Sequence, residues 1–193
     1  MKVGTNWVGF TVGHRIAGHP KCGRIHGHNL RVRVIVDGEV DAKTGMVVDF
    51  GVLKKALSDI VDPLDHHFLA ARGVGYMNSG YDGVNSVGLK NDIEYVVIDC
   101  RYILPKEDVI VLPLDIVSSE NLAGWILGKL YGESWAQGKI LTVQVSETGD
   151  NIAEASQFVG GINTQLLTVT GWTSTSAMNP IYYWQNGAKW TPV

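Results

Sequence analysis

"HGHNLRVRVIVDG", residues 26–38, opens with two histidines and continues as an alternation of apolar and polar residues. Side chains alternate between the two faces of a β-strand, so this pattern predicts a strand with one apolar face. Arg31 and Arg33 fall on the opposite, polar face. The apolar face carries His26, His28, Leu30, Val32, Val34 and Val36. We therefore predict that both histidines point to the core side of a sheet.

Two further stretches have the same period of two residues. "WVGFTVGH", residues 7–14, places Val8, Phe10, Val12 and His14 on one face. "ILTVQVSE", residues 140–147, does the same for Leu141, Val143, Val145 and Glu147. A third histidine and a carboxylate thus lie on apolar rows. Because an unpaired charge is costly in a core, Glu147 is expected to have a partner there, unless the strand ends earlier and the side chain returns to solvent.

Two helices are predicted between these strands. "DFGVLKKALSDIV", residues 49–61, has apolar residues at helical spacing, and so has "SSENLAGWILGKLYG", residues 118–132, with Ser118 or Ser119 as N-cap. The apolar positions are Phe50, Leu53, Leu57 and Ile60 in the first and Leu122, Ile126 and Leu130 in the second. The order of elements predicts an α+β fold in which an antiparallel sheet carries both helices on one face.

The length of 193 residues suits one domain with appendages. We expect a catalytic domain over residues 1–154, interrupted by an insertion at about 71–112. Residues 155–193 form a C-terminal extension, rich in aromatic residues and turn formers, to which the pattern assigns no role.

Composition limits the class of binding partner and the cell compartment that can be expected. The net charge of −3 gives no electrostatic reason to expect a nucleic-acid or anionic-membrane partner, so a small molecule is the expected ligand. Two cysteines do not make a disulfide framework. The N-terminus lacks the apolar core of a signal peptide, and no later run would span a bilayer. A cytoplasmic protein is expected.

The three inward histidines predict a metal site. His26 and His28 lie about 6.6 Å apart along one strand and point the same way, and His14 on a second strand can complete a three-nitrogen site. Such a site leaves a position open, where zinc can activate water or a substrate hydroxyl. The alternative is a set of partly buried, hydrogen-bonded histidines without metal.

Cys22 and the pair formed by Asp65 and His66 are candidate acid-base groups. Lys21 and Arg24 flank Cys22 in a glycine- and proline-containing loop, an environment that favours the thiolate. A buried, inert cysteine is the alternative. In "LDHHFL", residues 64–69, the carboxylate of Asp65 can orient a histidine base, although such a sequence is often only a polar turn.

Six motifs together resemble one family, the 6-pyruvoyl and 6-carboxytetrahydropterin synthases. In chain order they are "GFTVGHR", "HPKCGRIHGHN", "VDFGVLKKAL", "LDHHFL", "SSENLAGWI" and "VSET". The resemblance covers residues 5–70 and 113 to about 150. It implies a tunnelling fold, in which a four-stranded antiparallel sheet with two helices joins two others into a barrel. It also implies a hexamer of two stacked trimers, with active sites between subunits.

The resemblance also implies roles for individual residues. Zinc would be held by His14, His26 and His28. Cys22 would abstract protons, with Asp65 and His66 as its acid-base partners. Glu147 would anchor the guanidine-like edge of a pterin, and Ser119 would lie beside it where the family more often has threonine.

Three residues separate Cys22 from His26, the spacing of the 6-carboxytetrahydropterin branch. That branch converts 7,8-dihydroneopterin triphosphate to 6-carboxytetrahydropterin, acetaldehyde and triphosphate on the route to queuosine or archaeosine. A 6-pyruvoyl product is the alternative within the family. Outside it, a cysteine-histidine hydrolase and a non-catalytic pterin-binding protein stay open.

Overall fold

A computed structural model describes residues 1–72, 84–90, 93–99, 101–149, 151–160, 168–170, 182–185 and 188–192. Its strands are β1 (Lys2–Gly4), β2 (Val8–His14), β3 (His26–Asp37), β4 (His67–Ala71), β5 (Val84–Lys90), β6 (Ile93–Ile98), β7 (Tyr102–Pro105), β8 (Val109–Leu112), β9 (Lys139–Thr148), β10 (Asn151–Val159), β11 (Thr168–Thr170), β12 (Tyr182–Gln185) and β13 (Ala188–Pro192). The helices are α1 (Phe50–Val61) and α2 (Ser119–Leu130), with 3₁₀ turns at Asp62–Leu64, Lys106–Asp108 and Ser134–Ala136.

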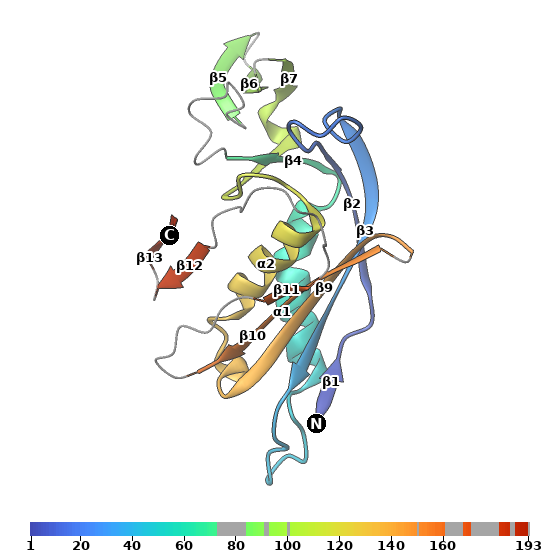
Figure 1. The fold of residues 1–193 in the computed structure, drawn as a ribbon, viewed down its shortest axis with the longest axis vertical. Coiled ribbons are helices and arrows are strands. Elements are labelled where there is room, and N and C mark those ends of the chain that lie inside the picture. Colours follow the sequence, from blue (N-terminus) through green and yellow to red (C-terminus); the bar gives the residue numbers. More distant parts are fainter. Residues whose placement is uncertain are drawn as a thin grey trace.

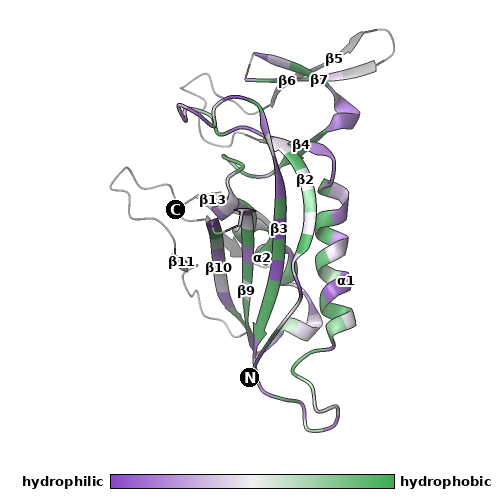
Figure 2. Cartoon of the chain, turned by 90° about the vertical axis from the view of Figure 1, so that its right-hand side faces the viewer, coloured by the Kyte–Doolittle hydropathy of each residue, from purple (hydrophilic) through white to green (hydrophobic). Residues whose placement is uncertain are grey.

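The main sheet has the strand order β11-β10-β9-β3-β2-β4-β8, and β1 pairs with β3 outside this path. The predicted strands form its antiparallel centre, where β3 lies between β2 and β9. On one side the sheet turns parallel, because β4 runs parallel to both β2 and β8. Hydrophilic and hydrophobic bands alternate along β3 (Figure 2), as the period of two residues requires.

The sheet differs in two respects from the four-stranded antiparallel sheet that was expected. It has eight strands within the described part of the chain, and it is mixed. The additional strands β4 and β8 are short apolar runs, "HFLAA" and "VIVL", whose pattern carries no information about which strand they pair with.

Both helices pack on the same face of the sheet, and α1 also contacts α2 (Figure 1). The core between them contains Leu53 and Leu57 from α1, Leu122, Ile126 and Leu130 from α2, and Val32, Val34, Leu141, Val143 and Val145 from the sheet. The predicted helix faces are confirmed at these positions. Phe50 is an exception, since it is 59% exposed at the start of α1 rather than in the core. It directly follows the N-cap Asp49, ahead of the first turn that packs on the sheet.

Beyond the end of the main sheet near β4, the strands β5, β6 and β7 form a separate three-stranded antiparallel sheet (Figure 1). It occupies part of the stretch expected as an insertion, whereas β8 joins the main sheet. The expected end of the catalytic domain at residue 154 falls inside β10, which pairs with β9 as far as Val159. Of residues 155–193, those at 161–167, 171–181, 186–187 and 193 lie outside the described residues. No helix of the described part is long and apolar enough to cross a membrane.

Candidate metal centre and active site

Three histidines meet where β2 ends and β3 begins. In the antiparallel register His14 lies opposite His26, and Val12 lies opposite His28. The ring centroids are 4.6 Å apart for His14 and His26, 5.2 Å for His14 and His28, and 5.0 Å for His26 and His28. One nitrogen from each ring lies within 4.8 Å of the others. The two strands thus bring together the three imidazoles that the alternation placed on inward rows.

Backbone carbonyls fix the orientation of two of the rings. The Nδ1 atom of His14 is 2.7 Å from the carbonyl oxygen of Val117, and that of His26 is 2.8 Å from the carbonyl oxygen of Arg24. A carbonyl only accepts, so each Nδ1 carries a proton, and in the neutral ring Nε2 then presents a lone pair. Among the described residues, both Nε2 atoms are buried without a hydrogen-bond partner.

Buried polar atoms without partners are rare and costly, and here two of them belong to the same cluster. A divalent cation fits this arrangement, since histidines that bind metal ions usually donate the other ring N–H to a carbonyl or carboxylate. Burial is the main reason that the pKa of His14 lies below its ordinary value, and neighbouring His26 lowers it further. The Val117 carbonyl and the charge of Glu147 act in the opposite direction. His14 is therefore neutral at pH 7, as a metal ligand must be.

Cys22 lies in a loop that connects the two histidine strands. The amide of Ile16 donates to the Cys22 carbonyl at 2.7 Å, and the amide of Gly23 donates to the His19 carbonyl at 2.9 Å. The imidazole Nδ1 of His19 accepts from the Cys22 amide at 2.9 Å. A β-carbon at Gly23 would lie 2.5 Å from the His19 oxygen, so only glycine fits there. Cys22 itself is a half-buried free thiol.

Asp65 and His66 are hydrogen-bond partners, with Nδ1 of His66 2.9 Å from Oδ2 of Asp65. The other carboxylate oxygen accepts from the Thr11 amide at 2.7 Å. This hydrogen bond is the main cause that holds the pKa of Asp65 below its ordinary value, and His66 adds to the effect. The ionised carboxylate thus orients the imidazole of His66, whose side chain is 82% exposed.

Glu147 is the extra residue of a β-bulge. Ser146 pairs with Ile152 and Thr148 pairs with Asn151, so the ladder between β9 and β10 skips Glu147. Bulges redirect side chains and are frequent beside active sites. The half-buried carboxylate of Glu147 acts electrostatically on His14, which places it on the side of the histidine cluster.

Ser119 is the first residue of α2, directly after the N-cap Ser118, whose hydroxyl accepts from the Asn121 amide at 3.3 Å. The same turn contains Val117, the hydrogen-bond acceptor of His14. The start of α2 is therefore tied to the histidine cluster, while the described contacts do not link the hydroxyl of Ser119 itself to any other candidate residue.

The sequence alone did not identify Thr11, Arg15 and His19 as parts of this region. His19 caps a turn by accepting from the Cys22 amide, but the residue types that commonly do so are Ser, Thr, Asn and Asp, so a histidine gives no such signal. Thr11 acts through its backbone, which leaves no signal in the residue type. Asp99, the ionic partner of Arg15, comes from a distant segment that no local pattern connects to it.

Comparison with known proteins agrees with the geometry. The family model described as 6-pyruvoyl tetrahydropterin synthase matches residues 5–157. A Methanocaldococcus jannaschii protein, provisionally named 6-carboxy-5,6,7,8-tetrahydropterin synthase, is 34% identical over 115 residues, or 59% of this chain and 66% of that protein. An Archaeoglobus fulgidus protein with the same provisional name is 45% identical over 60 residues, or 31% of this chain and 51% of that protein. The chain thus spans between half and just under two thirds of these two relatives.

Among solved structures, 6-pyruvoyl tetrahydropterin synthase from Plasmodium vivax superimposes with a TM-score of 0.64 at 24% identity, covering 82% of this chain and 99% of that one. At this identity the likeness concerns the fold. The match to the family model, however, extends over most of the chain and includes every candidate residue described above. The chain belongs to the 6-pyruvoyl tetrahydropterin synthase family.

Proposed function

We propose that the chain is a zinc-dependent 6-carboxytetrahydropterin synthase. The observation that carries the metal centre is the pair of buried, unpartnered Nε2 atoms in the histidine cluster. The three-residue spacing between Cys22 and His26 supports the carboxy branch, and so do the names of the two relatives. The proposed substrate is 7,8-dihydroneopterin triphosphate, and the proposed products are 6-carboxytetrahydropterin, acetaldehyde and triphosphate.

His14, His26 and His28 would hold the ion through nitrogen ligands, a donor set suited to zinc. When bound, zinc supplies a Lewis acid that lowers the pKa of a substrate hydroxyl. The protein contributes one ring nitrogen from each of three imidazoles. The Val117 and Arg24 carbonyls set the orientations of two of these rings.

Proton transfer is assigned to Cys22 and His66. The loop hydrogen bonds hold Cys22 between the two histidine strands, where its thiolate can remove a proton from substrate. Asp65 accepts from Nδ1 of His66 and leaves Nε2 free to take up and return a proton. Cys22 and His66 would remove and return protons during isomerisation, triphosphate elimination and the carbon–carbon cleavage that releases acetaldehyde, and one water supplies the second carboxylate oxygen.

Substrate recognition is assigned to Glu147 and Ser119. A carboxylate accepts hydrogen bonds from the N–H groups of a guanidine-like pterin edge, which also compensates the half-buried charge of Glu147. The position of Ser119 in the first turn of α2 allows its hydroxyl to bind the same ring system.

We further propose assembly of the tunnelling fold into barrels of three subunits and a homohexamer in the cytoplasm. Both ends of the main sheet, β11 and β8, present an unpaired side within the described chain, as strands that join neighbouring subunits would. The exposed imidazole of His66 fits a site that a second subunit completes. The chain is likewise proposed to divide into two parts. These are a catalytic domain with an insertion at about 71–112 and an extension after residue 154.

Incubation of the zinc-loaded protein with 7,8-dihydroneopterin triphosphate, followed by mass spectrometry of the products, tests this function. The expected products are acetaldehyde and a 6-carboxy pterin. A 6-pyruvoyl product would assign the chain to the other branch. Bound pterin without any product would contradict an enzymatic role.

A further inference from the structure

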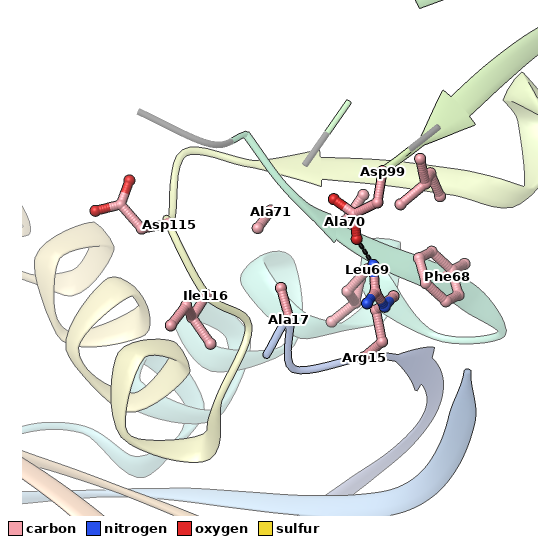
Figure 3. Close-up of a pocket in the computed structure, with 10 residues that line it drawn as sticks. Arg15, Ala17, Phe68, Leu69, Ala70, Ala71, Asp99, Asp115 and Ile116 are labelled. Carbon is pink, nitrogen blue, oxygen red and sulfur yellow. Dashed lines mark ion pairs between the residues drawn. The ribbon is translucent and has the colours of Figure 1, made fainter. Parts of the chain in front are cut away.

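Arg15 connects the histidine cluster to two other parts of the molecule. It directly follows His14, and its Nε atom donates to the carbonyl oxygen of Gly23 at 2.8 Å. Its guanidinium also forms an ion pair with Asp99, which Figure 3 shows as a dashed line. The side chains of Arg15 and Asp99 are only 5% and 4% exposed. One side chain thus contacts the cysteine loop and a distant carboxylate at the same time.

The carboxylate belongs to the inserted sheet. Asp99 lies in the turn between β6 and β7, and the ring of Tyr102 in β7 lies 5.5 Å from the Arg15 guanidinium carbon. Behind this turn, Val96 and Ile98 pack with Phe68 and Ala70 of β4 in a small second core. The strand that ends directly before Asp99 is therefore anchored to the main sheet.

The junction is closely packed. The cavity beside the ion pair measures about 20 Å³, roughly the space of one water molecule, and is lined by main-sheet and insert residues together (Figure 3). A cavity of this size admits no substrate.

The contacts of Arg15 fix the backbone on which Cys22 is carried. Gly23, whose carbonyl Arg15 binds, is the next residue after Cys22, and the Cys22 carbonyl already accepts from Ile16. A guanidinium can donate to two acceptors in a fixed planar geometry, whereas an ammonium cannot reproduce that arrangement. The guanidinium of Arg15 and the carboxylate of Asp99 are both buried, so either one without the other would be an unpaired buried charge. The ion pair therefore holds the guanidinium in this orientation.

We propose that the inserted sheet positions the catalytic cysteine loop through the Arg15–Asp99 ion pair. Arg15 and Asp99 are positioning residues: neither touches substrate in this account, and both act through the carbonyl of Gly23 on the placement of Cys22. The insertion is thereby a functional part of the active site. This inference rests on the proposed role of Cys22 in proton transfer, and its structural half can be measured without turnover.

The test compares wild type with Asp99→Asn, which removes the charge and keeps the shape of the side chain. Three measurements are made on zinc-loaded protein: hydrogen exchange of the peptide covering residues 16–23, the rate of iodoacetamide alkylation of Cys22, and kcat. We expect exchange of the loop to rise about tenfold and kcat to fall about 10- to 100-fold, because small misplacements of reacting groups have effects of this size. The alkylation rate should change as well, whereas bound zinc per chain should stay equal.

Asp59→Asn is the matched control, because Asp59 also pairs with a cation, Lys55, at 2.6 Å but on the exposed surface of α1. It should leave all measurements unchanged. Arg15→Lys keeps the charge and loses the simultaneous contact to Gly23, so it should loosen the loop like Asp99→Asn. Asp99→Glu, which retains the carboxylate, should lie nearer to wild type and serves if the asparagine variant does not fold.

Loop exchange and Cys22 alkylation equal to wild type in both Asp99→Asn and Arg15→Lys would overturn the proposal. So would an increase in exchange spread evenly over the chain, because that indicates general destabilisation. If wild type turns over no pterin while the loop still responds to Asp99→Asn, the positioning role stands and the proposed function fails.

Discussion

At the scale of single residues, the protonation of the three histidines decides what the site can bind. Two rings donate through Nδ1 to backbone carbonyls and present Nε2 to the buried centre. The lowered pKa of His14 keeps that ring neutral. Two ring nitrogens that face each other without hydrogen-bond partners suit a shared cation.

Replacement of His28 by alanine should remove both metal and activity, whereas Cys22→Ala should remove only activity. Loss of one of three ligands is expected to lower zinc affinity by more than about tenfold, since even changes to the residues behind a ligand cost that much. Zinc per chain, measured by elemental analysis after dialysis, checks this together with turnover. His67→Ala is the control for zinc content only, because His67 lies outside the cluster but binds the Asp65 carbonyl beside the acid-base pair. A Cys22→Ala variant with near-normal rates would exclude the cysteine from the mechanism.

The metal-free protein should lose stability as the pH falls below about 6.5, the ordinary pKa of histidine. In the unfolded chain His14 is protonated near that pH, whereas burial lowers its pKa in the folded chain, so that protonation there requires a lower pH. The unfolded state then binds more protons, so the free energy of unfolding falls with the pH. Urea unfolding at several pH values, for wild type and His14→Gln, measures this contribution. Parallel pH profiles for the two proteins would contradict it.

The residue pattern predicted the histidine cluster because alternation along two strands leaves few choices for where His14, His26 and His28 point. The contact between Arg15 and Asp99 could not be predicted in the same way. It depends on how the inserted sheet packs against β4, a tertiary arrangement that leaves no periodic signal in the sequence.

At the scale of elements, the ends of α1 and α2 are set by polar residues at their first turns. Asp49 caps α1 by accepting from the amides of Gly51 and Val52, and Ser118 caps α2 through Asn121. The second cap matters for the site because it adjoins Val117, the acceptor of His14. Capping thereby links the geometry of a helix end to that of the metal centre.

Asp49→Ala should destabilise the fold by about 1 kcal/mol, the usual cost of a lost N-cap. Asp59→Ala on the same helix removes only an exposed ion pair and should cost less than about 0.5 kcal/mol. Chemical denaturation of both variants measures the difference. Equal effects from the two substitutions would show that the cap does not stabilise α1.

The strands and helices with a clear period were predicted close to their observed bounds, as β3 and α2 illustrate. The parallel pairing of β4 with β2 and β8 was not predicted, because strand order depends on long-range contacts that a short apolar run does not specify. The bulge at Glu147 was also missed, since nothing in "VSET" distinguishes an extra residue from a paired one.

At the scale of the whole molecule, the candidate groups are distributed over the connection between β2 and β3, the turn before β4, the bulge in β9 and the start of α2. The antiparallel centre of the sheet brings the first and third of these together, and both helices pack on the sheet face to which the apolar rows of β2, β3 and β9 point (Figure 1). The exposed His66 is the group that a neighbouring subunit would enclose.

The protein should elute as a hexamer with six times the chain mass of 21.0 kDa. Association would pair the free sides of the terminal strands, which otherwise remain open to aggregation. Light scattering coupled to size-exclusion chromatography gives the mass directly. A monomer over a range of concentrations in the micromolar region would exclude a site that is completed between subunits.

Anomalous diffraction at the zinc absorption edge, from crystals of the zinc-loaded protein, tests the central claim most directly. We predict one strong peak per chain between the three rings, about 2.0–2.1 Å from the Nε2 atoms of His14 and His26 and from a ring nitrogen of His28. Rings that stay apart with no peak between them, in crystals supplied with excess zinc, would contradict the metal centre and the enzyme built on it.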